Sequence, residues 1–242
     1  MKGRGYFAAT RDPLVSLAVT LPLLLLYNAG LLMPGNTTWN ATDLLTRVVL
    51  HFFGVAGFLA VNGAIVLGSV ILIAVLVRRG QFRPGHWALL CVEGVAWGLL
   101  IGFGVTHLMR EAGLGPGAGT GLGVVVREVS VVQALSSSAG AGYWEELVFR
   151  LGLVGGPIAA AGRLWQGKGA GFKQALVAAG AIVVSSVLFS LAHYVGGLES
   201  PDAFTFWYRA ISGCVFATIF LVRGFAVAAY SHFLYDVWVM LV

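Results

Sequence analysis

Long apolar stretches, separated by short polar or basic segments, repeat along most of this chain of 242 residues. A helix needs about 20 apolar residues to cross a bilayer. The stretches that reach or approach this length are Pro13–Met33, Arg47–Val77, Gly85–Met109, Ala139–Ala161, Gly171–Tyr194, Ala203–Val222 and Phe225–Val242. The pattern predicts an all-α fold, a polytopic transmembrane helical bundle of about seven to eight spans. We expect residues 1–242 to form a single transmembrane domain.

Two segments leave the number of spans open. Val124–Leu135 is apolar but contains Arg127 and Glu128. It is interpreted as an interfacial helix, an eighth span or the lead-in to the fourth span. Pro13–Met33 follows basic residues as a signal peptide does, yet no convincing small-residue cleavage site follows it. We therefore expect this segment to remain as a helix.

Composition and charge support a membrane protein. Hydrophobic residues make up 58 % of the chain and charged residues only 10 %, which excludes an ordinary soluble domain. The net charge of +5 comes mostly from Lys and Arg at the ends of the apolar stretches, so it indicates orientation rather than nucleic-acid binding. Their distribution predicts a cytoplasmic N-terminus. An excess of Arg over Lys, 12 against 3, favours a GC-rich prokaryote and its plasma (inner) membrane.

Charged residues stand out in the fourth span. Glu145, Glu146 and Arg150 lie in an otherwise apolar run. An ionisable side chain at bilayer depth costs roughly 2.5–3.5 kcal/mol on insertion scales, so such residues usually mark a site. Glu146 and Arg150 are four apart, the spacing of an ion pair on one face of a helix. Glu145 points about 100° away on an α-helix. It is left without a local counter-ion and is available for chemistry.

Later spans add histidines at matching spacing. His193 follows Phe189 by four residues, and Asp236 follows His232 by four. If the three helices pack together, Glu145 and His193 hold and deprotonate a water molecule. His232 then donates to the oxygen that becomes negative when a peptide carbonyl is attacked.

Other interpretations remain open. A Glu–Arg pair also braces helices, two histidines and two carboxylates are also a zinc ligand set, and intramembrane charges also mark transport paths. No His-Glu-x-x-His signature supports zinc. The weaker candidates for a site are Glu93, His51, Asn62 and His107. Asn36 and Asn40 each begin an Asn-x-Thr triplet, which matters only in a glycosylating host.

Together the three motifs resemble a known family. Glu-Glu-x-x-x-Arg from Glu145 to Arg150, Phe-x-x-x-His ending at His193 and His-x-x-x-Asp from His232 to Asp236 occur in this order. They are similar to the motifs of the CAAX protease and bacteriocin-processing (Rce1-like) family of glutamic intramembrane endopeptidases. The resemblance places the motif-bearing catalytic core at about residues 136–242.

The resemblance implies a function and roles. Glu145 and His193 would activate the water, and His232 with Asp236 would form the oxyanion site. Glu146, Arg150 and Phe189 would support them. Family members with Asn at the position of Asp236 have an amide donor there, whereas an ionised Asp cannot donate and would orient His232 instead. No cofactor is implied.

The expected partners are the lipid bilayer and a membrane-anchored protein or peptide with a CAAX-like tail or a bacterial sorting signal. The alternatives are a catalytically inert membrane-binding or immunity protein of the same fold, and a metal-dependent membrane hydrolase.

Overall fold

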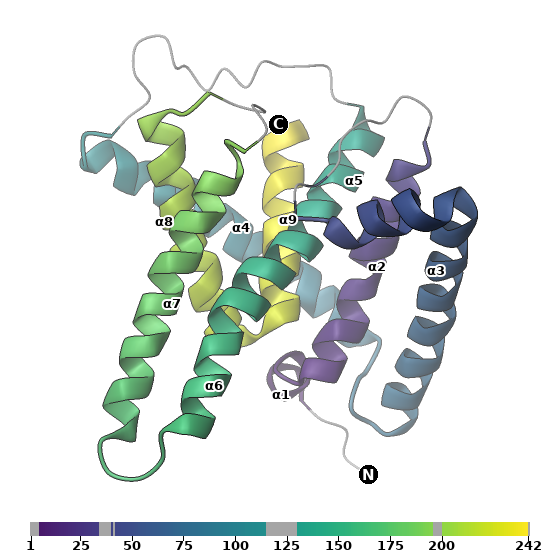
Figure 1. Cartoon of the computed structure of the whole chain (residues 1–242), viewed down its shortest axis with the longest axis horizontal. Coiled ribbons are helices and arrows are strands. Elements are labelled where there is room, and N and C mark those ends of the chain that lie inside the picture. The colour runs from purple at the N-terminus through teal and green to yellow at the C-terminus, as the bar shows by residue number, and fades with distance from the viewer. Residues whose placement is uncertain (1–4, 34–39, 41, 115–129, 196–199, 242) are drawn as a thin grey trace.

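The described part of the chain is a bundle of helices. A computed structural model describes residues 5–33, 40, 42–114, 130–195 and 200–241, which contain helices and no strands (Figure 1). The elements are α1 (Tyr6–Thr10), α2 (Pro13–Leu31), α3 (Leu44–Arg78), α4 (Gly85–Glu111), α5 (Val131–Gly140), η1 (Ala141–Gly155), α6 (Gly156–Leu164), α7 (Ala170–Ala192), α8 (Ala203–Arg223) and α9 (Phe225–Leu241). The all-α prediction is confirmed.

The helices coincide with the predicted spans. Six helical segments of the described residues are long and apolar enough to cross a membrane, and α9 is a shorter apolar helix. The fourth span is longer than predicted because α5, η1 and α6 form one continuous segment, Val131–Leu164. The described end of Val124–Leu135 is therefore the lead-in to the fourth span, while residues 124–129 lie outside the described residues.

Polar side chains cap the N-terminal ends of several helices. Asp12, Asp43 and Asp202 accept hydrogen bonds from backbone N–H groups in the first turns of α2, α3 and α8. Ser130 and Gln133 form a capping box at the start of α5. These side chains satisfy N–H groups that have no partner within the helix. The caps fix where each apolar stretch becomes helical.

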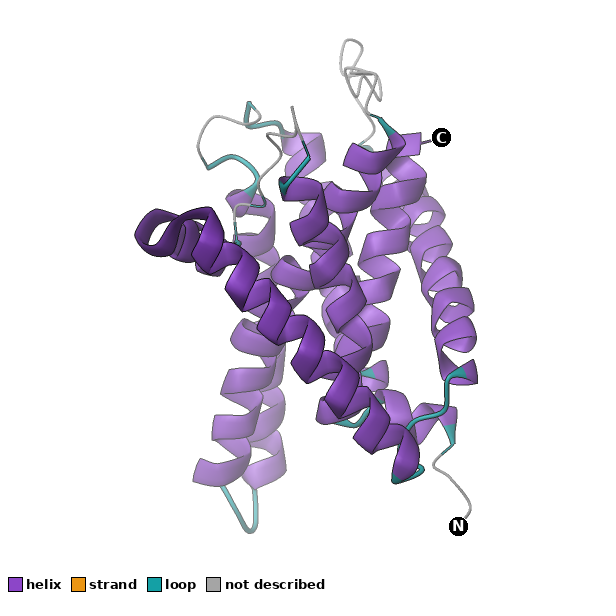
Figure 2. Cartoon of the chain, turned by 90° about the vertical axis from the view of Figure 1, so that its right-hand side faces the viewer, coloured by secondary structure: helices purple, strands orange, loops and turns teal. Residues whose placement is uncertain are grey.

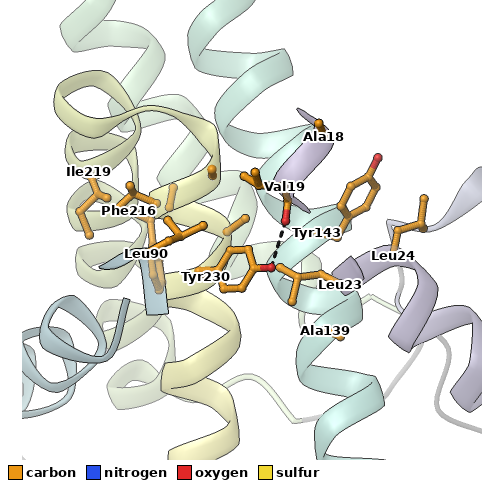
Figure 3. Close-up of a cluster of buried hydrophobic side chains, with 14 of the residues drawn as sticks. Ala18, Val19, Leu23, Leu24, Leu90, Ala139, Tyr143, Phe216, Ile219 and Tyr230 are labelled. Atoms are coloured by element: carbon orange, nitrogen blue, oxygen red, sulfur yellow. Dashed lines mark hydrogen bonds between the residues drawn. The ribbon is translucent and has the colours of Figure 1, made fainter. Parts of the chain in front are cut away.

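Helix α9 lies in the middle of the bundle. All its residues from Phe225 to His232 are buried, and α2, α4, α5, α8 and η1 pack around it. The Tyr230 hydroxyl donates to the Val19 carbonyl of α2 at 2.9 Å, within a cluster of apolar side chains (Figure 3). Helix α9 is only 17 residues long, and it runs through the interior of the bundle with protein on most of its sides.

Glycines allow the neighbours of α9 to approach closely. A Cβ added at Gly94, Gly98 or Gly102 of α4 would lie 2.5–3.3 Å from atoms of α9. At Gly142 of η1 it would lie 2.6 Å from the Ala229 carbonyl oxygen. Small residues at helix interfaces are typical of membrane bundles, because lipid supplies no hydrophobic drive for helix association. Gly142 brings the first turn of η1 against α9 beside His232.

An ion pair holds the beginning of α9 in place. Arg223, the last residue of α8, is buried and contacts Glu93 of α4 through Nε at 2.6 Å and a second nitrogen at 2.8 Å. Gly224 has φ +93°, and a Cβ there would lie 2.5 Å from the Thr10 carbonyl oxygen. The chain can therefore reverse direction within one residue. Glu93 serves this ion pair and lies outside the polar cluster described below.

Helix α3 lies at the edge of the bundle and packs mainly against α2. It bends at Gly54, where φ is 61° and ψ is −166°. The portion before the bend runs across the bundle, and the portion after it slants along it (Figure 2). The connections α3–α4 and α6–α7 lie at the same end as α1, and α9 ends at the other (Figure 1). Arg78, Arg79, Arg163 and Lys173 thus lie at one end of the bundle.

Candidate active site

The paired glutamates lie in an unusual stretch of helix. Residues Ala141–Gly155 form a π-helix, in which backbone hydrogen bonds span five residues instead of four. The wider turn changes the side-chain directions expected of an α-helix. Both Glu145 and Glu146 now face His232 of α9. The angle between the directions of the two carboxylates is therefore smaller than the angle of about 100° predicted for an α-helix. π-Helical segments are frequent at functional sites.

Glu146 is the centre of the buried cluster. Its Oε1 accepts a hydrogen bond from His232 Nδ1 at 2.8 Å and lies 3.2 Å from the Arg150 guanidinium. Glu146 and Arg150 are 0 % and 1 % exposed. The predicted Glu146–Arg150 ion pair is confirmed. Because a carboxylate oxygen accepts, Nδ1 of His232 carries a hydrogen and the other ring nitrogen, Nε2, faces away from Glu146.

Glu145 presents its two oxygens to different partners. Oε1 accepts a hydrogen bond from Asn40 Nδ2 at 2.7 Å. Oε2 is buried, lies 4.0 Å from His232 Nε2 and accepts no hydrogen bond from the described residues. Two polar atoms more than 3.5 Å apart make no direct hydrogen bond, so Oε2 can accept a hydrogen bond from a water molecule instead. Of the two Glu145 oxygens, Oε2 is thus the one without a hydrogen-bond donor among the described residues; Oε2 of Glu146 is buried and without a donor as well.

Aromatic rings enclose His232. Phe216 of α8 stacks on the imidazole with ring centroids 4.5 Å apart, and Phe189 of α7 lies edge-on at 5.8 Å. His232 Nε2 is 3.6 Å from Asp236 Oδ2, one helical turn further along α9. The predicted stacking of His232 and Asp236 on one face is confirmed. The rings fix the plane of the imidazole, and the carboxylates fix the directions of its two nitrogens.

The same rings surround Arg150. Its guanidinium carbon lies 4.3 Å from the centre of the Phe189 ring and 5.2 Å from that of Phe216. A cation over an aromatic face is attracted by the ring quadrupole, more strongly where water is excluded. Phe189 therefore contacts both Arg150 and His232, and it ties α7 to the polar cluster. The family resemblance implies a supporting role for Phe189, and that role stays a prediction.

His193 lies beside this cluster without touching the glutamates. Its ring is 5.1 Å from that of Phe189, and Nδ1 lies 2.9 Å from the Phe189 carbonyl oxygen. A carbonyl oxygen only accepts, so Nδ1 carries the hydrogen and Nε2 of the neutral ring is an acceptor. Within the described residues, no hydrogen bond or ion pair joins His193 to Glu145. The structure instead places His232 and Asn40 at that carboxylate.

The weaker candidates lie elsewhere. Asn62 accepts a hydrogen bond from Asn28 at 2.7 Å, which joins α3 to α2. His51 and His107 are exposed. Ser231, the neighbour of His232, is buried and donates to the Val227 carbonyl of its own helix at 2.7 Å.

Sequence reasoning missed Asn40 and Phe216. Asn40 was interpreted only as the start of an Asn-x-Thr triplet, but the same triplet can form a side-chain turn in which the Asn oxygen accepts from the residue two further on. Phe216 lies in an apolar run and has no sequence signal that separates it from its neighbours. The second triplet, at Asn36, lies outside the described residues.

The positions of the His, Asp and Glu side chains can be compared with those of a metal site. Among the described residues, no group of three or more His, Cys, Asp or Glu side chains is positioned to hold a metal ion. His232 Nδ1 is occupied by Glu146, and Glu145 Oε1 is occupied by Asn40. The polar cluster is connected by hydrogen bonds and ion pairs.

A family comparison covers this part of the chain. The family model described as type II CAAX prenyl endopeptidase Rce1-like matches residues 127–238. Residues 127–238 belong to the Rce1-like family. The Rce1-like region includes every charged residue of the three motifs, from Glu145 to Asp236. Asn40 and helices α1–α4 lie outside it. No curated protein and no solved structure matched the chain.

Proposed function

We propose that this protein is an intramembrane endopeptidase that hydrolyses a peptide bond of a membrane-tethered protein or peptide by means of a water molecule activated by Glu145. The observation that carries the proposal is the state of Glu145. One oxygen is held by Asn40, and the other is buried, unpartnered and 4.0 Å from His232 Nε2. The Rce1-like region supports a protease at the level of the family.

The chemistry follows from these contacts. Glu145 Oε2 takes a proton from water, and the water oxygen attacks the carbonyl carbon of the peptide bond. The carbonyl oxygen becomes negative and accepts a hydrogen bond from Nε2–H of His232, which acts in its doubly protonated form while Glu146 holds Nδ1–H. Glu145 then returns the proton to the leaving nitrogen as the C–N bond breaks. Asp236, which cannot donate when ionised, orients the His232 ring.

His193 helps to orient the attacking water through its Nε2 atom. Because Nδ1–H donates to the Phe189 carbonyl, Nε2 can accept a hydrogen bond from the attacking water. Its ring approaches the cluster only across Phe189. We therefore expect His193 to act when the substrate and water are bound. No covalent intermediate is involved, because none of the motif positions is a Ser or Cys, and the neighbouring Ser231 hydroxyl donates to the Val227 carbonyl of its own helix.

The test is Glu145→Gln in proteoliposomes. Purified parent and variant protein are supplied with a library of lipid-anchored peptides, and the released fragments are identified by mass spectrometry. The variant should lose at least about 100-fold in rate, the lower end of what a general base supplies. Glu111→Gln makes the same change at the exposed end of α4 and should keep the parental rate. Cleavage by Glu145→Gln at the parental rate overturns the proposal.

Two further outcomes decide between the alternatives. An inert binding or immunity protein would leave every peptide intact in parent and variants alike, even when all of them melt at the same temperature. A metal-dependent hydrolase would lose activity with a chelator and regain it with zinc. We expect activity to survive chelation, with no stoichiometric metal in elemental analysis.

We propose C-terminal tails of membrane-anchored proteins, either CAAX-like tails or bacterial sorting signals, as the substrate class. A small pocket between α2 and α3, lined mostly by apolar side chains, reaches Trp144, the neighbour of Glu145. Comparing the C-termini of membrane proteins in cells with the parent or the Glu145→Gln variant should show which tails are retained.

A further inference from the structure

We infer that Asn40 is a positioning residue of the active site, which orients the Glu145 carboxylate so that Oε2 faces the attacking water. The inference rests on the proposed function and adds a residue from the connection between α2 and α3, outside the Rce1-like region. The observation is the 2.7 Å hydrogen bond from Asn40 Nδ2 to Glu145 Oε1, between residues 105 positions apart.

The orientation of the Asn40 amide follows from its neighbour Thr42. The Asn40 oxygen Oδ1 accepts from the Thr42 backbone N–H at 2.9 Å and from the Thr42 hydroxyl at 2.6 Å. A backbone N–H only donates, so the amide atom facing it must be the oxygen. The nitrogen is thereby directed at Glu145. The Asn-x-Thr triplet fixes which end of the amide meets the carboxylate.

The backbone of Asn40 is anchored as well. Its N–H donates to the Tyr27 hydroxyl of α2 at 3.2 Å, and its carbonyl accepts from the Asp43 N–H at 3.2 Å. Tyr27 is 1 % exposed, and Asp43 caps α3 through a bond from the Thr46 N–H at 2.9 Å. The Asn40 side chain therefore projects from a point that two helices hold. A fixed donor is what preorganisation of a catalytic group requires.

A neutral donor suits the role. Among the described residues, the charged groups around Glu145 are Glu146 and Arg150 on η1 and His232 and Asp236 on α9, with Arg209 of α8 acting on Asp236 and Asp43 beside Asn40. Within the described residues, the only hydrogen bond to Glu145 Oε1 comes from Asn40. A cation there would form an ion pair and reduce the tendency of Glu145 to take a proton, whereas an amide fixes direction and leaves the charge in place. Asn40 thereby holds Oε1 in place by a hydrogen bond and leaves Oε2 to take the proton.

The test uses changes at both members of the triplet. Asn40→Ala should lower kcat by roughly 10- to 100-fold with KM unchanged, the effect expected from losing a hydrogen bond to a charged group. Thr42→Val, which removes the hydroxyl donor and keeps the shape, should lower kcat by a smaller factor. Thr42→Ser keeps both donors and is the matched control, with parental kcat expected. Melting temperatures in detergent identify any variant that fails to fold.

Asn40→Asp gives a readout that a purely structural role would not move. The new carboxylate faces Glu145 Oε1, and two facing carboxylates cannot both ionise easily. We expect little activity at alkaline pH and a recovery relative to the parent as the pH falls, because a protonated acid can donate to Oε1. A pH profile parallel to that of the parent, or parental kcat in folded Asn40→Ala, overturns the inference.

Failure of the inference is distinguishable from failure of the proposed function. If the parent cleaves and Glu145→Gln does not, the Asn40 variants test the inference alone. If the parent cleaves nothing, infrared difference spectra replace the rate. The carboxylate band that disappears in Glu145→Gln should shift in Asn40→Ala and stay in place in Thr42→Ser. An unshifted band in Asn40→Ala overturns the inference without any assay of hydrolysis.

Discussion

Close packing of η1 against α9 should control both stability and catalysis, and Gly142→Ala tests it. The added methyl would lie 2.6 Å from the Ala229 carbonyl oxygen and 2.9 Å from Phe233 Cβ. The first is backbone and cannot rotate away. Ordinary contact begins at 3.4 Å, so η1 and α9 must separate by about 0.8 Å. That displacement would bring the 2.8 Å bond from His232 to Glu146 beyond hydrogen-bonding distance.

The added methyl should lower both the melting temperature and the activity of the protein. Overpacking of this kind costs about 1–3 kcal/mol, and each kcal/mol shifts the melting temperature of a chain this size by about 2–4 °C. We expect Gly142→Ala to melt roughly 2–12 °C lower than the parent. Misplacement of catalytic groups by about 1 Å costs on the order of 100-fold in rate. Activity should therefore fall by about 100-fold even at temperatures where the variant is folded.

The assay pairs thermal unfolding in detergent with cleavage of a lipid-anchored peptide. Gly152→Ala is the matched control in the same helix, because its added methyl would meet only the Leu147 carbonyl oxygen, at 3.5 Å. It should melt and cleave as the parent does. If Gly142→Ala equals Gly152→Ala in both measurements, the close approach of η1 and α9 does not position His232, and the reasoning is refuted.

The remaining predictions concern the buried ion pair and the bend in α3. Glu146→Gln leaves the Arg150 charge without its 3.2 Å partner, and breaking a buried pair costs about 3–5 kcal/mol. Combining it with Arg150→Met should restore part of the melting temperature but no activity, and a double variant as unstable as the sum of the single ones would contradict the pairing. Gly54→Ala forces a residue with φ 61° and ψ −166° into a region that side chains avoid, at about 1–3 kcal/mol. Gly63→Ala, with open space around its added methyl, should show no loss in the same melting experiment.

Much of the fold can be predicted from short stretches of the sequence. Crossing a bilayer requires one continuous apolar segment per helix, so each span is visible within its own 20 residues or so. The predicted Gly85–Met109 and Ala203–Val222 correspond to α4, Gly85–Glu111, and α8, Ala203–Arg223. Pairs four residues apart are equally local. Glu146 with Arg150, and His232 with Asp236, could therefore be predicted from spacing.

The partners of Glu145 could not be predicted in this way. Its direction depends on the π-helical turn of η1, and nothing in the local sequence distinguishes that turn from an α-helix. Its donor, Asn40, is 105 residues away and comes from a connection between two other helices. The Glu93–Arg223 pair, whose members are 130 positions apart, is of the same kind.

The sequence by itself therefore determined an all-helical membrane protein, the order of its motifs and the pairs within each helix, because those properties depend on hydrophobicity and on spacing along one helix. Only the tertiary structure decided that His232 rather than His193 lies at the glutamates, and that Asn40 holds one oxygen of Glu145. Those contacts depend on how close the helices approach one another. Gly142 against α9 and the Tyr27 anchor of Asn40 set that approach.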